Sequence, residues 1–231
     1  MKFIILLPVV AIIVSSLTSC SSVSISNTGN SRLYSGELSE TDVLGLTSAS
    51  PTSVSAHGKW SSPRSGGRIL LVQSGAMMPD PALLAAFERR FDVVAFSGLK
   101  SEYTTRSSSE LKGETIPAAR KMRAAAAAAG AKHIVCVWGT VDSEDVEHAT
   151  KAVSWVPIAG GIVPDETEHM RLSLKAGVID TTSGRWDSVS HYSPVTKSVS
   201  ANLNRSARRT QHIESAKETG YEDLARKVAR G

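Results

Sequence analysis

Residues 131–141 read Ala-Lys-His-Ile-Val-Cys-Val-Trp-Gly-Thr-Val, and this stretch decides the fold. The alanine run Ala124–Ala129 leads into it through Gly130. Alanine has the highest helix propensity, and glycine adopts the left-handed conformation that ends many helices. The residues Ile134–Trp138 are continuously apolar and favour strands, which is typical of a strand covered on both faces. The stretch therefore predicts a helix, a glycine stop and a buried strand.

Upstream, the pattern predicts a β-α-β unit. Residues Arg68–Gln73 form an apolar strand, Asp80 can cap a helix with Pro81 at its first position, and Asp92–Phe96 form a second strand. The crossover should be right-handed and the two strands parallel. Thr115 can then cap a second helix that ends before Gly130, so that a second such unit closes on residues 133–141.

Downstream, the apolar period changes to strict alternation. Apolar residues from Met170 to Val178 alternate with polar ones, which predicts a strand with one buried face. Residues Asp180–Gly184 are a hairpin signal, and Arg185–Tyr192 should return antiparallel. Residues 142–155 are a weaker candidate for the preceding strand. We therefore expect an α/β (α+β) fold: a mixed sheet of two β-α-β-type units followed by an antiparallel meander.

The chain should end in an amphipathic helix. Apolar residues recur at helical spacing from Leu203 to Val228, and a break at Gly220 is left open. Charged side chains should form its outer, solvated face: Arg208, Arg209, Lys217, Glu218, Glu222 and Arg226.

Composition points to an ordinary globular protein. The chain has 231 residues, of which 41% are hydrophobic and 21% charged, and its net charge of +4 is too small to indicate nucleic-acid binding. We expect a signal peptide at 1–19, a flexible serine-rich tether at 20–66 and one α/β domain at 67–231. Apolar islands in the tether, such as Val43–Leu46, can dock onto the domain.

The N-terminus predicts export and lipidation. Lys2 and the apolar run Phe3–Val14 suit a signal peptide, and Leu17-Thr18-Ser19-Cys20 resembles the lipobox of bacterial lipoproteins. The resemblance implies cleavage after Ser19, a diacylglyceryl thioether on Cys20 and an acylated amine, such as a palmitate. An ordinary secretory signal is the alternative. The absence of aspartate after Cys20 implies the outer membrane and its periplasmic face. Cys136 is then left unpaired, and we expect it to be a small buried hydrophobe.

Two segments resemble a group of envelope lipoproteins. They are Gly130–Val141, and the run Val178–Trp186 that contains the Asp180–Gly184 turn. The group includes the curli secretion channel lipoprotein, the penicillin-binding-protein activator lipoprotein B and the N-terminal domain of TolB. The resemblance implies a non-enzymatic assembly or partner-binding role without catalytic residues or cofactors. The partner would be an envelope protein or a second copy of this chain.

Two candidate sites surround residues 155–164. Glu147, His148 and His169 lie in strands that flank this loop; if the hairpin turns near Ile158–Ala159, His148 faces His169 and the pair can bind a metal. This would suit an envelope hydrolase or a small-ligand-binding protein, although alternation places His169 toward solvent. The loop itself offers an apolar partner-binding surface, or else it is core. Its apolar residues are Val156, Ile158, Ile162 and Val163.

One further motif argues against a catalytic serine. Gln73-Ser74-Gly75 follows the first strand, where α/β proteins often place their sites. It lacks the glycine two residues before the serine that a nucleophile elbow requires. We therefore expect no catalytic residue there.

Overall fold

A long antiparallel hairpin forms the centre of the fold. In the computed structural model, which describes residues 19–28, 36–45, 62–100, 118–147, 166–200 and 205–230, the hairpin consists of β4 (His133–Glu147) and β5 (Glu166–Asp180). They pair in one unbroken register, from His133 opposite Asp180 to Glu147 opposite Glu166. The weaker strand candidate at residues 142–155 is therefore, as far as residue 147, the continuation of the central strand.

The parallel part of the sheet confirms the predicted β-α-β units. The strands β2 (Arg68–Gln73) and β3 (Asp92–Phe96) are parallel and joined by α2 (Pro81–Glu88). The helix α4 (Ala118–Ala128) leads into β4, which pairs in parallel with β2 on its other side. Gly130 has a φ of 70°, the left-handed conformation expected of the glycine that ends the alanine helix.

Both long strands are bordered by two short strands placed end to end. Along β4, residues 133–137 pair with β2, and residues 140–145 pair with β1 (Ser19–Ser24). Along β5, residues 173–179 pair with β6 (Trp186–Tyr192), and residues 166–170 pair with β7 (Thr196–Ser200). We call β4 residues 140–147 and β5 residues 166–173 the distal half of the hairpin.

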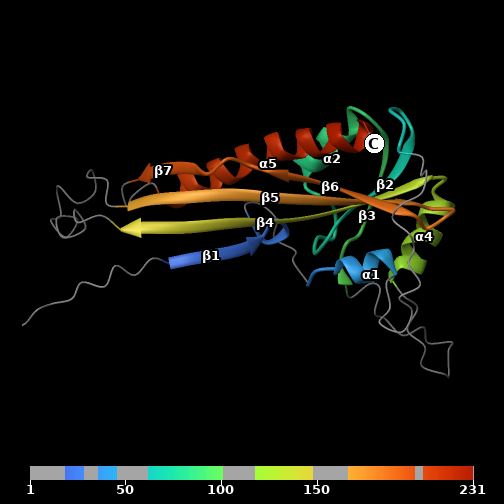
Figure 1. Ribbon diagram of the computed structural model, residues 1–231, viewed down its shortest axis with the longest axis horizontal. Helices are drawn as coiled ribbons and strands as arrows, with labels where there is room; N and C mark the ends of the chain where they lie inside the picture. Colours follow the sequence, from blue (N-terminus) through green and yellow to red (C-terminus); the bar gives the residue numbers. More distant parts are fainter. Residues whose placement is uncertain are drawn as a thin grey trace, which may run out of the picture.

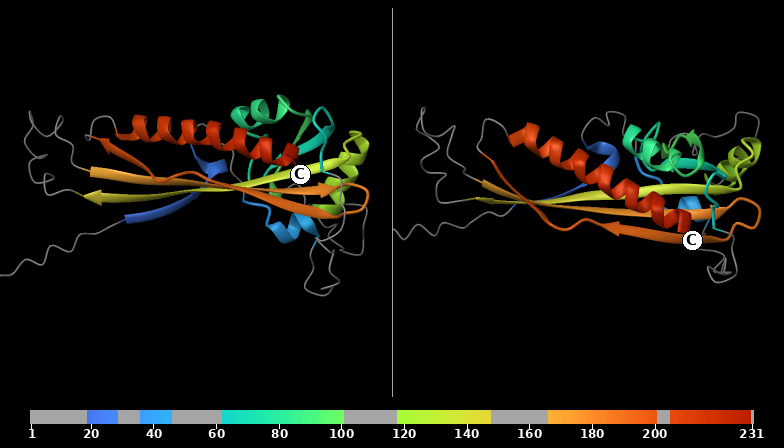
Figure 2. Two further views of the ribbon diagram at one scale, coloured as in Figure 1. Left: turned by 45° about the horizontal axis from the view of Figure 1, so that its top comes forward. Right: turned by 90° about the horizontal axis from the view of Figure 1, so that it is seen from above.

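Helices cover the two faces of the sheet unequally. The long helix α5 (Arg205–Arg230) and α2 pack on one face, over a core that includes Leu71, Val135 and Leu172. On the other face, α4 and the short α1 (Glu40–Leu44) pack near the start of β4 (Figures 1 and 2). In the described part of the chain, no helix covers the distal half on this second face, which we call the open face.

The N-terminal segment corrects the expectation of a tether at residues 20–66. Its described parts form β1, the short 3-10 helix η1 (Ile25–Asn27) and α1. Ile25 belongs to the core under α5, whereas Leu38, Val43 and Leu44 belong to the core of the other face, so the predicted docking of the apolar island is confirmed for Val43 and Leu44. The tether prediction fails here because side-chain hydrogen bonds and a few buried apolar residues fix a serine-rich strand.

The C-terminal helix is continuous, so a break at Gly220 is ruled out. A Cβ on Gly220 would lie 2.8 Å from Leu174 Cδ1 and 3.0 Å from Leu172 Cδ2 of β5. Glycine is used here because it lets the helix approach the sheet closely. Among the described residues, no helix is long and apolar enough to cross a membrane.

Candidate functional site

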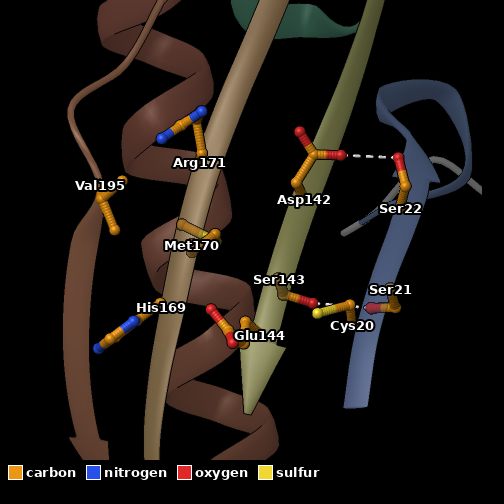
Figure 3. Close-up of a pocket in the computed structure, with 10 residues that line it drawn as sticks. All are labelled: Cys20, Ser21, Ser22, Asp142, Ser143, Glu144, His169, Met170, Arg171 and Val195. Atoms are coloured by element: carbon orange, nitrogen blue, oxygen red, sulfur yellow. Dashed lines mark hydrogen bonds between the residues drawn. The ribbon is translucent and has the colours of Figure 1, made fainter. Parts of the chain in front are cut away.

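A groove of about 510 Å³, which we call the distal groove, lies on the distal half of the hairpin (Figure 3). Three adjacent strands contribute polar side chains to it. These side chains are Cys20 and Ser22 of β1, Asp142 and Glu144 of β4, and His169 and Arg171 of β5.

The strand register arranges these six side chains in two rows. Cys20 lies opposite Glu144, which lies opposite His169. The second row is two residues away along the strands. In it, Ser22 lies opposite Asp142, which lies opposite Arg171. Because paired residues point to the same side of a sheet and every second residue repeats that side, both rows lie on the open face.

Hydrogen bonds on both faces of the sheet hold β1 at the edge of β4. Ser22 Oγ donates to Asp142 Oδ1 at 2.7 Å on the open face. On the helix-covered face, the hydroxyls of Ser21 and Ser143 are 2.8 Å apart, and Arg209 of α5 donates to Ser143 Oγ at 2.7 Å. The serine-rich strand β1 is therefore bonded to β4 by its side chains as well as its backbone.

The register contradicts the predicted pairing of His148 with His169. His169 lies opposite Glu144, and Glu147 lies opposite Glu166 three positions farther along the ladder. His148 lies outside the described residues. In the part of the chain that the structure describes, no three His, Cys, Asp or Glu side chains are grouped closely enough to hold a metal ion. The proposed metal pair thus loses the geometry on which it rested.

The predicted partner-binding loop lies outside the described residues. Val156, Ile158, Ile162 and Val163 all fall between the ends of β4 and β5. Their role remains a prediction.

The side chains of Ser74 and Cys136 are both buried. Ser74 is 2% exposed, and its Oγ donates to the Leu38 carbonyl at 3.0 Å. Cys136 is fully buried, and burial raises the pKa of its thiol far above the usual range. Cys136 is therefore the buried hydrophobe that its strand predicted. Cys20, by contrast, is exposed.

A buried ionic cluster was not found from the sequence. Lys217 is only 1% exposed, although we expected it on the outer face of its helix. Its Nζ lies 3.1 Å from Asp80 Oδ2, and the Tyr221 hydroxyl donates to the same oxygen at 3.0 Å. Asp80 precedes α2 at the N-cap position as predicted, but its side chain makes no capping bond. The sequence did hold one sign that Lys217 is buried. It lies four residues from Ile213 and four from Tyr221, and both of these are buried residues of α5.

A second groove lies at the opposite end of the hairpin. It measures about 520 Å³ and is lined by Arg64, Arg68, Lys132 and His133, so we call it the basic groove. Arg68 is already engaged there, because its Nε donates to Asp92 Oδ2 at 2.6 Å and its Nη1 to the Ala129 carbonyl at 3.3 Å.

Comparisons with known proteins give a family but little else. No curated protein matches the sequence. A crystal structure described as a neuraminyllactose-binding hemagglutinin homologue from Helicobacter pylori is similar, at 12% identity and a TM-score of 0.35. The match covers 77% of this chain and 92% of the Helicobacter pylori chain. This likeness is too low to carry an argument. The sequence model of the YafT bacterial lipoproteins, however, matches residues 39–230, and the chain therefore belongs to the YafT bacterial lipoprotein family.

Proposed function

We propose that this protein is a non-enzymatic partner-binding or assembly factor, held by a lipid on Cys20 at the periplasmic face of the outer membrane. Membership of a bacterial lipoprotein family implies a lipid anchor. The observation that carries the assignment to Cys20 is its position: it ends a lipobox-like sequence, it is exposed, and it lies next to the start of strand β1. The serines at positions 21 and 22 support the outer membrane.

Carboxyl groups with lowered pKa values serve local structure. Burial would raise the pKa of Asp180, but hydrogen bonds from Ser183 and Thr182 in the hairpin turn outweigh it and lower that pKa. Lys227 and His191 hold the pKa of Asp223 well below its usual range on the surface of α5. These carboxyl groups stabilise turns and helices, which is a structural role.

The lipidation claim is tested by mass spectrometry of the native protein purified from membranes. We expect a mature chain that begins at Cys20 and carries diacylglyceryl and N-acyl groups. A Cys20→Ser variant should lose these groups and leave the membrane fraction. An unmodified Cys20 in the native protein would overturn the proposal.

The partner-binding claim is tested by cross-linking and pull-down from detergent-solubilised envelopes. We expect one specific envelope protein, or a second copy of this chain, to be captured. Ile158→Asp and Ile162→Asp should reduce that capture and leave the far-UV circular dichroism unchanged. If both variants unfold, the loop is core, and if capture is unaffected, the partner does not bind through it.

A further inference from the structure

We propose that the lipid on Cys20 is fixed to the sheet without slack, so that the open face of the distal half lies against the membrane surface. This rests on the lipidation of Cys20 proposed above. The domain would then have a defined orientation, whereas the tether expected at residues 20–66 would let it move freely. The occupant of the open face is the bilayer that carries this protein's own anchor.

The chain has no free length between the lipid and the fold. Cleavage after Ser19 makes Cys20 the first residue, and Cys20 already pairs with Glu144. The four residues after it, up to Ser24, continue the same register with β4 as far as Thr140. No residue is therefore left over to act as a tether between the thioether and the sheet.

Buried contacts directly after β1 hold this segment in place. Ile25, directly after β1, is 1% exposed and packs where Gly139 leaves room; a Cβ on Gly139 would lie 2.9 Å from Ile25 Cγ2. Ser26 Oγ donates to the Ser74 carbonyl at 2.6 Å and accepts from Gln73 Nε2 at 3.0 Å. Buried hydrogen bonds of this kind are costly to break. Releasing β1 and the residues after it therefore requires breaking buried hydrogen bonds to Gln73 and Ser74, at the end of β2.

The lipid begins on the open face of the sheet. The Cys20 side chain lies in one row with Glu144 and His169, so a group bonded to its sulfur starts in the distal groove (Figure 3). The lining of His169, Arg171 and the carboxylates offers donors and acceptors that suit glyceryl esters and lipid headgroups. The acyl chains must then continue away from the sheet into the bilayer.

The open face also carries side chains suited to a membrane surface. Tyr192 lies opposite Ser173 on this face and is 70% exposed, and Val195, which lines the distal groove, is 44% exposed. Tyrosine is enriched where one end of a side chain is apolar and the other is wet, as at a bilayer surface.

The other end of the hairpin lies far from the lipid. His133 and Glu144 are eleven residues apart on β4, which is about 36 Å at 3.3 Å per residue. The basic groove, which includes Arg64 and Lys132, therefore lies nearly a strand length from the lipid, at the end of the sheet where α1 and α4 cover this face.

Nitroxide labels on the lipidated protein test this orientation. Arg171→Cys places a label on the open face, and Thr182→Cys places one at the far end of the hairpin. Both native residues are exposed, whereas Cys136 is buried and the lipidated Cys20 cannot react. In vesicles of phosphatidylethanolamine, phosphatidylglycerol and a nickel-chelating lipid, nickel should relax the label at position 171 several-fold more than the label at 182. Equal relaxation at the two positions overturns the inference.

A matched variant separates a fixed lipid from a nearby one. We insert ten Gly/Ser residues after Ser22, followed by a second copy of Ser21 and Ser22, so that the part of β1 from Ser21 to Ser24 is kept and the lipid gains about 18 Å of reach. The difference between the two labels should then disappear; if it persists, the attachment does not set the orientation and the inference fails. Mass spectrometry of each sample distinguishes the two proposals. An unmodified Cys20 overturns the proposed function and this inference with it, whereas a lipidated protein with equal relaxation overturns the inference alone.

Discussion

The buried ammonium group of Lys217 joins three parts of the chain. Its Nζ lies 3.1 Å from Asp80 Oδ2 before α2, and it donates to the Thr28 carbonyl after η1 at 3.5 Å. The Tyr221 hydroxyl donates to the same carboxylate, and burial, followed by the charge of Asp80, raises the pKa of Tyr221. A buried charge is tolerated only when it is paired, so the cluster fixes the position of α5 against α2 and the N-terminal segment.

Replacing this lysine should therefore be severe. Lys217→Met leaves the carboxylate of Asp80 without its cation, and we expect the free energy of unfolding to fall by about 3–5 kcal/mol. Urea unfolding followed by tryptophan fluorescence measures the change. Lys227→Met is the control, because Lys227 is 43% exposed and its pairing with Asp223 should contribute under about 1 kcal/mol. Adding Asp80→Asn to Lys217→Met should recover part of the loss; no recovery would mean that packing, not charge, is responsible.

A second residue gives a dependence on pH. Lys227 and His191 both lie 2.8 Å from Asp223 Oδ2 and lower the pKa of this carboxyl group. A lowered pKa in the folded state contributes stability above the unfolded pKa of about 3.9, and that stability is lost as the pH falls toward the folded pKa. Asp223→Asn should therefore cost about 1–2 kcal/mol at pH 7. The difference from the native protein should shrink below about pH 4. Urea titrations at pH 7 and pH 3 test this, and an equal difference at both pH values would contradict it.

At the scale of elements, the contact of α5 with β5 depends on Gly220. In an exposed helix, glycine to alanine stabilises by about 1 kcal/mol. Here the new Cβ would crowd Leu172, Leu174 and His191, so we expect Gly220→Ala to destabilise by about 1–3 kcal/mol. Thr219→Ala, at the neighbouring exposed position, should change stability by less than about 0.5 kcal/mol. Thermal unfolding of the two variants measures the contrast, and a higher melting temperature for Gly220→Ala would show that the leucines can yield.

The elements that were predicted correctly carry their own apolar pattern. The strands β2, β3 and β5 and the first half of β4 follow from continuous or alternating apolar residues. The strand β1 has only Val23 as a large apolar residue, and it forms because β4 offers a free edge at residues 140–145. That edge exists only after β5 has extended β4, so a local reading of the chain does not reveal it.

Only part of the candidate site could be predicted, because the rest depends on how distant strands pair. Cys20 was identifiable because a lipobox is a local motif. The distal groove was not, because it depends on the register of two strands separated by eighteen residues. The predicted turn near Ile158–Ala159 would set His148 opposite His169. The structure instead pairs His169 with Glu144, four residues before His148. The glycines and prolines of the loop allow several turns, so its sequence does not determine the register.

At the scale of the whole molecule, each long strand is covered by two short ones. An uncovered strand edge is a template for pairing with another chain. The strands β1 and β2 cover β4, and β6 and β7 cover β5, so the hairpin has little free edge in the described part of the chain (Figure 1). The N-terminal segment is thus the cover for the distal edge of β4 as well as the carrier of Cys20.

Removing residues 20–28 should therefore have two separate effects. It exposes the backbone of β4 at residues 140–145, and it empties the site of Ile25 in the core under α5. We expect a lower melting temperature and concentration-dependent association through the freed edge, measured by light scattering after size-exclusion chromatography. Ile25→Ala separates the two effects: it should cost about 2–5 kcal/mol but leave the protein as associated as the native chain, because β1 still covers the edge. A truncated protein that is no more associated than the native chain would show that this edge of β4 does not need β1, and that the strand serves only to position the anchor.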